Sequence, residues 1–80
     1  MSKLRSVSGK KLISLLEKID FEVIRVKGSH HFIKHKDGRV TVIPVHANED
    51  IGPGILSKIL KDLELTKEDF NKLLKLRKAI

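Results

Sequence analysis

Two turn signals divide residues 21–43 into three short runs that favour β-strands. Gly28-Ser29 follows the first run, and Asp37-Gly38 follows the second. Asp-Gly between two strand-like runs is a strong hairpin signal. Pro44 limits the third run to a sheet edge or to the end of a strand. The pattern therefore predicts a three-stranded antiparallel meander with strands over 21–27, 30–35 and 40–43.

Apolar residues at helical spacing lie on both sides of this meander. Ser8 is a suitable N-cap for a helix over residues 9–19, and Pro53 suits the first turn of a helix that ends near residue 63. Thr66 to Asp69 resembles a capping box and predicts a third helix up to about residue 78. The helices need one face of the sheet to bury their apolar stripes, so we predict an α+β fold with the order αβββαα.

The second strand indicates which face of the sheet stays open. Alternate residues of a strand point to opposite faces, and a slip of one residue would exchange the two sets. We expect Ile33 to face the helices. The open face of the strand then carries His30, Phe32 and Lys34, and the face toward the helices carries His31, Ile33 and His35. Phe32 is therefore expected to be an exposed aromatic residue, which suits a binding surface.

The formal net charge of +7 is concentrated in the first half of the chain. Residues 1–39 hold ten basic and four acidic residues, whereas residues 40–80 hold seven and six. Such a field favours a polyanion such as nucleic acid, or an acidic protein, although lysines also serve solubility alone. The chain has three Phe and no Tyr or Trp. This composition disfavours base-stacking RRM and OB modules and favours recognition of backbone and shape.

Size and composition indicate the cellular setting. Eighty residues make one small domain with a thin core. The absence of cysteine excludes a disulfide framework and a thiolate metal site, so we expect an intracellular, cytoplasmic protein. There is no apolar run of about 18 residues to span a membrane, and residues 1–6 do not lead into the apolar segment of a signal peptide.

The segment Lys27-Gly28-Ser29-His30-His31 places two imidazoles beside a glycine at a break between strands. Histidine can take and give a proton near neutral pH, and nearby cations suit a site that cuts RNA. The plainer interpretation is one half-buried and one exposed histidine without chemistry. For His31 we favour a backbone-bonded imidazole at the edge of the core, and we expect His35 to lie at the surface.

Taken in order, these residues resemble a known family. Ser8–Leu16 leads into Phe21–Phe32, and the hairpin is followed by Val40–His46 and then by a helix that Gly52-Pro53-Gly54 opens. This order is similar to the HicA, or YcfA-like, toxin family of type II toxin–antitoxin systems, over about residues 8–65. The chain departs from the family pattern in the added segment 66–80, which could pack on the core, stabilise a dimer or contact an antitoxin.

The resemblance implies an αβββα fold like that of double-stranded RNA-binding domains and a metal-independent mRNA interferase without a cofactor. It also implies a HicB-type antitoxin that covers the active site. The family's catalytic histidine aligns with His30, with His31 as the second choice, and His46 matches a further histidine that could assist. Cations near the histidines can bind phosphate, the glycine permits close approach of the RNA backbone, and lysines of the first helix can contact RNA. The RNA-binding candidates are therefore Lys10, Lys11, Lys27, Gly28, Ser29, Lys34 and Arg39.

Three alternatives stay open beside this interpretation. A zinc site is disfavoured, because His31 and His35 lie about 13 Å apart on a strand and His30 points to the other face. A non-catalytic module that binds structured RNA by shape would explain the charge. A domain that binds only an acidic antitoxin is the third. A homodimer and a hetero-oligomer with the antitoxin are both compatible with the sequence.

Overall fold

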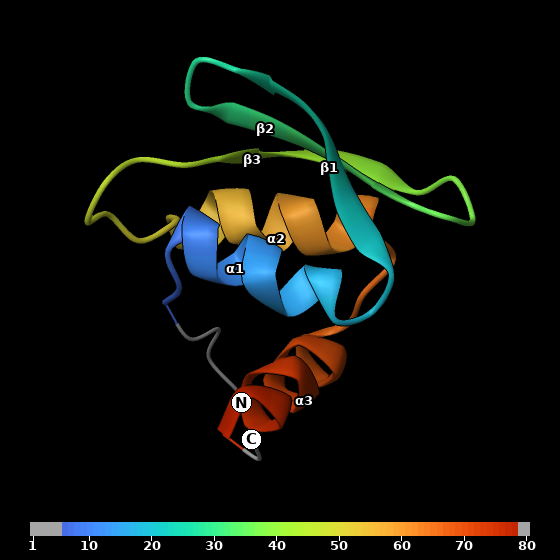
Figure 1. Ribbon diagram of the computed structural model, residues 1–80. Helices are drawn as coiled ribbons and strands as arrows, with labels where there is room; N and C mark the ends of the chain where they lie inside the picture. Colours follow the sequence, from blue (N-terminus) through green and yellow to red (C-terminus); the bar gives the residue numbers. More distant parts are fainter. Residues whose placement is uncertain (1–5, 79–80) are drawn as a thin grey trace.

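An antiparallel sheet forms one layer of the structure, and helices cover one of its faces (Figure 1). The computed structural model describes residues 6–78, with side chains described up to residue 75. The elements are α1 (Gly9–Glu17), β1 (Phe21–Lys27), β2 (His30–His35), β3 (Val40–Pro44), α2 (Pro53–Asp62) and α3 (Lys67–Lys78). The strand order is β1-β2-β3, so each hairpin joins neighbouring strands and β3 is an edge strand. This arrangement confirms the predicted α+β fold with an added C-terminal helix.

Local hydrogen bonds fix the helix ends close to their predicted positions. The Ser8 hydroxyl accepts a hydrogen bond of 3.1 Å from the backbone of α1, as an N-cap does. α1 stops at Glu17 because the next two N–H groups donate to carbonyls three residues back and Asp20 has a φ of 73°. At α3, the N–H of Thr66 donates to Asp69 Oδ2 at 2.9 Å, and the N–H of Asp69 donates to Thr66 Oγ1 at 3.0 Å. The predicted capping box is therefore confirmed.

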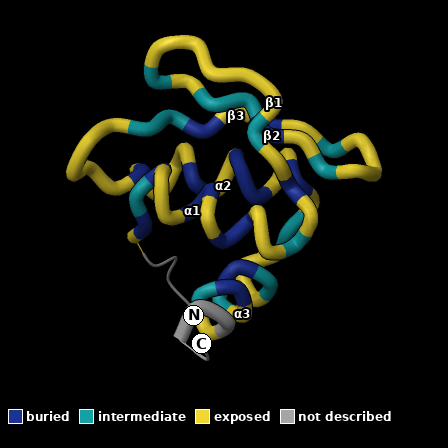
Figure 2. The backbone as a smooth tube through the Cα atoms, viewed as in Figure 1, coloured by how far each residue is buried: buried dark blue, intermediate teal, exposed yellow. Residues whose placement is uncertain are grey.

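One hydrophobic core lies between the sheet and the helices (Figure 2). Ile33 of β2 is only 1% exposed, which confirms that this residue faces the helices. Phe70 of α3 is fully buried and α3 packs against α1, so the added helix belongs to the same core. The main core side chains are Leu12, Leu15, Leu16, Ile33, Ile43, Leu56, Ile59, Leu60, Leu63, Phe70 and Leu73.

A β-bulge at Ile24 changes which residues of β1 face outward. Before the bulge, Val23 packs against the core, and after it Arg25 pairs with Phe32 of β2. Paired residues of an antiparallel sheet share a face, so Arg25 and, two residues later, Lys27 lie on the open face. An unbroken strand would turn both cations to the side of Val23. The extra residue therefore exchanges the two faces of the strand, as bulges do elsewhere.

No helix within residues 6–78 is long and apolar enough to cross a membrane. The expectation about a signal peptide concerns the first residues of the chain, of which 1–5 lie outside the described part. The same holds for residues 79–80 of the predicted C-terminal segment.

Candidate functional site

The turn between β1 and β2 presents the two histidines at one end of the sheet. Gly28 has a φ of 59°, in the left-handed region that favours glycine. A positive φ at the first of two turn residues is typical of a type II′ turn. A Cβ on Gly28 would meet open space, so its backbone conformation is what requires glycine. The turn places Lys27 and His30 directly opposite each other on the open face.

The carbonyl of Ser29 connects this turn to the end of β3. It accepts a hydrogen bond of 2.7 Å from the N–H of Val45 and one of 3.4 Å from Nδ1 of His31. On the neighbouring strand, Pro44 pairs with His30. The Gly-Ser-His-His and Pro-Val-His motifs therefore meet at one end of the sheet, where the turn between β1 and β2 lies near the end of β3 (Figure 1). His46 is exposed in the loop that joins β3 to α2.

The first turn of α1 packs against the same end of β3. A Cβ on Gly9 would collide with the carbonyl oxygen of Pro44 and would lie 3.1 Å from atoms of Val45. Only glycine allows this approach without a shift of the backbone. Lys10 and Lys11 follow Gly9 and are both exposed. The lysines predicted to contact RNA from the first helix thus begin at the same end as the histidine turn.

The structure gives His30 and His31 different surroundings. His30 is exposed on the open face, where its imidazole is accessible to a ligand. His31 is half-buried on the helix side, and its Nδ1 donates to the Ser29 carbonyl. This is the backbone-bonded imidazole favoured for His31 from the sequence. The geometry therefore favours His30 as the residue that meets a substrate.

Arg25 is a candidate site residue that the sequence analysis missed. Its guanidinium carbon lies 6.0 Å from the centre of the Phe32 ring, in the range of a cation–π contact. Phe32 lies on the expected open face, two residues after His30, but it is half-buried and not fully exposed as predicted. The adjacent apolar pair Val23-Ile24 breaks the alternation of β1, and this pair is the signal that could have indicated the bulge.

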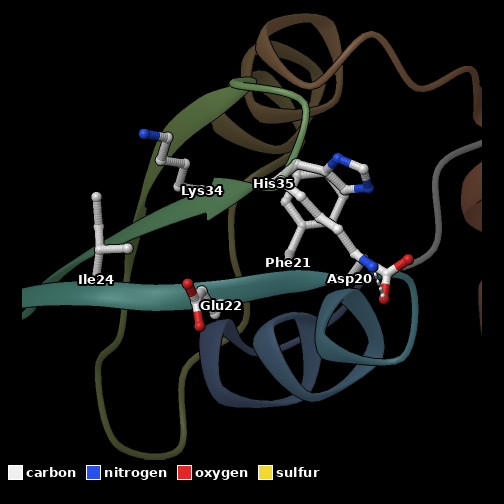
Figure 3. A pocket seen from close by; sticks show the side chains of 7 residues that line it. Asp20, Phe21, Glu22, Ile24, Lys34 and His35 are labelled. Carbon is white, nitrogen blue, oxygen red and sulfur yellow. Dashed lines mark ion pairs between the residues drawn. The ribbon is translucent and has the colours of Figure 1, made fainter.

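Lys34 lies on the open face, but toward the other end of β2. It is four residues from His30, which is about 13 Å along an extended strand. It lines a shallow hollow of about 610 Å³ at that end of the sheet. Figure 3 shows this hollow, which is lined by Asp20, Phe21, Glu22, Ile24, Lys34, His35 and Lys36.

Arg39 is engaged by the protein itself at the end of the sheet that is far from His30. Its Nε donates to Asp37 Oδ2 at 2.9 Å, and its Nη1 donates to the Leu63 carbonyl at 2.7 Å. Its guanidinium also lies 5.3 Å from the centre of the Phe21 ring. The hydrogen bond from Arg39 lowers the pKa of the exposed Asp37 carboxyl to about 2. Arg39 therefore stabilises the turn before β3, and the structure does not bring it to His30 or His31.

His35 is placed more deeply than the surface position predicted for it. Its side chain is 16% exposed, and its ring lies edge-on to the Phe21 ring with 4.7 Å between centres. Its Nδ1 accepts a hydrogen bond of 3.1 Å from the N–H of Asp37. His35 thus has a structural role in the turn between β2 and β3.

Within residues 6–78, no group of three or more His, Asp or Glu side chains is arranged to hold a metal ion.

Comparison with known proteins agrees with this arrangement of motifs. A search of curated protein sequences gives no match to the chain. The model of one protein family, described as HicA toxin of bacterial toxin-antitoxin, matches residues 9–65. These residues contain α1, the whole sheet, the turn with His30 and all of α2, and α3 follows them. The chain therefore belongs to the HicA toxin family of toxin–antitoxin systems.

Proposed function

We propose that this protein is an endoribonuclease that cleaves mRNA and inhibits translation in the cytoplasm, with His30 as its principal catalytic residue. The observation that carries the proposal is the exposed imidazole of His30, opposite Lys27, at the turn of a chain from a toxin family. A proton-transfer group must reach the reacting atoms, and His30 meets that condition better than the half-buried His31.

The reaction that suits these residues is transesterification within the RNA chain. A base takes the proton of the ribose 2′-hydroxyl, and that oxygen attacks the adjacent phosphorus. The bond from phosphorus to the 5′ oxygen breaks, and an acid gives that oxygen a proton. His30 transfers one of these protons, and His46 at the same end of the sheet is the candidate for the other. Lys27 stabilises the negative charge that develops on the phosphate.

We also propose that a HicB-type antitoxin neutralises the toxin by covering this end of the sheet. A toxin of a toxin–antitoxin system implies an antitoxin partner. Arg25, Lys27 and Lys34 outnumber Glu22, which pairs with Lys34 on the open face, so the face carries net positive charge and an acidic partner surface would complement it. Cleavage is expected to stop when the antitoxin is added in excess and to resume when the antitoxin is degraded.

The test is incubation of the purified protein with a long single-stranded RNA in the presence of EDTA. We expect cleavage by the wild-type protein, products with 2′,3′-cyclic phosphate and 5′-hydroxyl ends, and loss of cleavage in His30→Ala. His31→Ala is the matched control, because it alters the neighbouring imidazole on the other face. Products with 5′-phosphate ends, or cleavage that only a divalent metal restores, would contradict the proposed chemistry.

A non-catalytic RNA-binding module is the second candidate, and the cationic open face favours RNA binding in either case. The same experiment separates the two. RNA that is retarded in a gel but stays intact with wild type, His30→Ala and His31→Ala alike would replace the nuclease with a binding module.

A further inference from the structure

We propose that Phe32 and Arg25 form a stacking platform for one unpaired base beside His30, so that the protein cuts RNA where it is single-stranded. The inference rests on the proposed function and names its substrate class. Of the three phenylalanines, Phe21 is 2% exposed and Phe70 is fully buried. Phe32 alone lies on the open face of the sheet, where its ring contributes no packing against the helices.

The surroundings of Phe32 have the chemistry that stacks a base. The guanidinium of Arg25 lies 6.0 Å from the centre of the ring, and Val42 of β3, itself 37% exposed, faces the ring from the other side. Bases stack on aromatic rings and on guanidinium planes. Stacked bases are about 3.4 Å apart, so a base between ring and guanidinium needs roughly 7 Å. Arg25 is exposed, so its side chain can move away from the ring to admit one.

The position of the platform relative to His30 gives it a role in cleavage. Phe32 and His30 are two residues apart on one face of β2, which corresponds to about 7 Å. A base on the ring would therefore hold its own ribose within side-chain reach of the imidazole. The bulge at Ile24 is what supplies Arg25 to this face, because without the extra residue Ile24 would stand opposite Phe32.

The platform selects unpaired RNA because a duplex hides the faces of its bases. In an A-form helix each base is stacked on its neighbours and paired, and proteins reach chiefly its phosphates and 2′-hydroxyls. Cations alone would bind both forms of RNA. An aromatic ring between the cations adds affinity only for a strand whose base can turn out onto it. The number of aromatic residues in the sequence is small, but the structure places one of them at the site.

Binding measurements on the full chain test the platform. All proteins carry His30→Ala so that the RNA stays intact, and each is titrated with one single-stranded RNA and with its duplex. We expect Phe32→Leu to weaken binding of the single strand by about 5- to 100-fold, the range for loss of one stacked base. Binding of the duplex is expected to be unchanged, because its phosphate contacts remain.

A fluorescent variant gives a second readout that does not depend on affinity. The chain has no Trp, so Phe32→Trp introduces a single indole at the platform. The matched control is Ile55→Trp, because Ile55 is 51% exposed on α2 and does not lie on the open face of the sheet. We expect single-stranded RNA to quench the first indole and not the second.

Equal quenching of the two indoles, or a Phe32→Leu protein that binds the single strand as tightly as its parent, would overturn the platform. If Phe32→Leu weakens binding but the protein with His30 intact never cleaves RNA, the platform stands and the nuclease fails. If the protein cleaves and Phe32→Leu changes neither binding nor cleavage of the single strand, the nuclease stands and the platform fails.

Discussion

His30 and His31 follow one another in β2, and the pleat of the strand turns their rings to opposite faces. Their roles diverge for that reason. His30 meets solvent beside Lys27, whereas His31 is half-buried on the helix side and donates to the Ser29 carbonyl. The same carbonyl also accepts a hydrogen bond from the N–H of Val45, which joins the turn to the end of β3. At the scale of residues, His30 is therefore the accessible histidine of the pair, and it is the one to which we assign proton transfer in the proposed reaction.

Asp37 gives the fold a predictable response to acid. The hydrogen bond from Arg39 holds the pKa of Asp37 at about 2, below its ordinary value of 3.8. A carboxyl with a lowered pKa stabilises the fold at pH values above about 4, and that stabilisation is lost as the pH falls through about 2. We therefore expect the Tm of the wild-type protein to fall more steeply between pH 4 and pH 2 than that of Asp37→Asn.

Thermal unfolding followed by circular dichroism at several pH values measures this difference. The pKa values of Asp62 and Asp69 are also lowered by hydrogen bonds, from Lys58 and from the backbone of Thr66 respectively. Their contribution is common to both proteins and cancels. Because Asp37 is exposed, added salt is expected to shrink the difference. Parallel curves at low salt would show that the Asp37–Arg39 contact does not stabilise the fold.

At the scale of elements, the close packing of α1 on β3 depends on Gly9. We expect Gly9→Ala to lower the free energy of unfolding by about 1–3 kcal/mol, the usual cost of overpacking. The added methyl group would collide with the Pro44 carbonyl. Gly54→Ala is the control, since a Cβ there meets no atom within 4 Å and Ala favours a helix by up to about 1 kcal/mol. Urea unfolding curves that rank the two variants in the opposite order would contradict this packing.

The added helix α3 contributes to the stability of the domain through Phe70. This side chain is fully buried, so Phe70→Ala is expected to cost about 3–5 kcal/mol of unfolding free energy. Lys72→Ala, an exposed change on the same helix, is expected to cost far less. Urea denaturation measures both variants. A Phe70→Ala protein that unfolds at the wild-type urea concentration would show that α3 does not belong to the cooperative core.

For the whole molecule, most of the fold was predictable from the sequence, but the residues that β1 contributes to the open face were not. Caps, turn residues and apolar periodicity act locally, so the strands, helices and the inward position of Ile33 were predicted correctly. The bulge at Ile24 breaks the alternation of β1, so a prediction that assumes strict alternation places Arg25 on the wrong face. Arg25 was therefore overlooked, and Arg39 was grouped with the site by sequence proximity, although its contacts with Asp37 and Leu63 hold it elsewhere.

The net charge of the whole molecule predicts that the proposed RNA binding depends on salt. Each phosphate contact with single-stranded RNA changes the slope of log K against log salt by about 0.7. We expect Lys27→Ala and Lys34→Ala to reduce the slope by about that amount each, because both lysines lie on the open face. Lys58→Ala is the control, since Lys58 lies on α2 and pairs with Asp62 at 3.1 Å. A slope that falls only for Lys58→Ala would move the RNA to the helical side.

The most direct measurement of the central claim is chemical rescue of His30→Ala by free imidazole. Removal of a proton-transfer group is expected to slow RNA cleavage by about 100- to 10,000-fold. Because His30 is exposed, added imidazole can occupy the vacated space, and we predict that it restores cleavage in proportion to its concentration. A His30→Ala protein that cleaves RNA at the wild-type rate, or one that binds RNA and stays inactive at every imidazole concentration, would contradict proton transfer by His30.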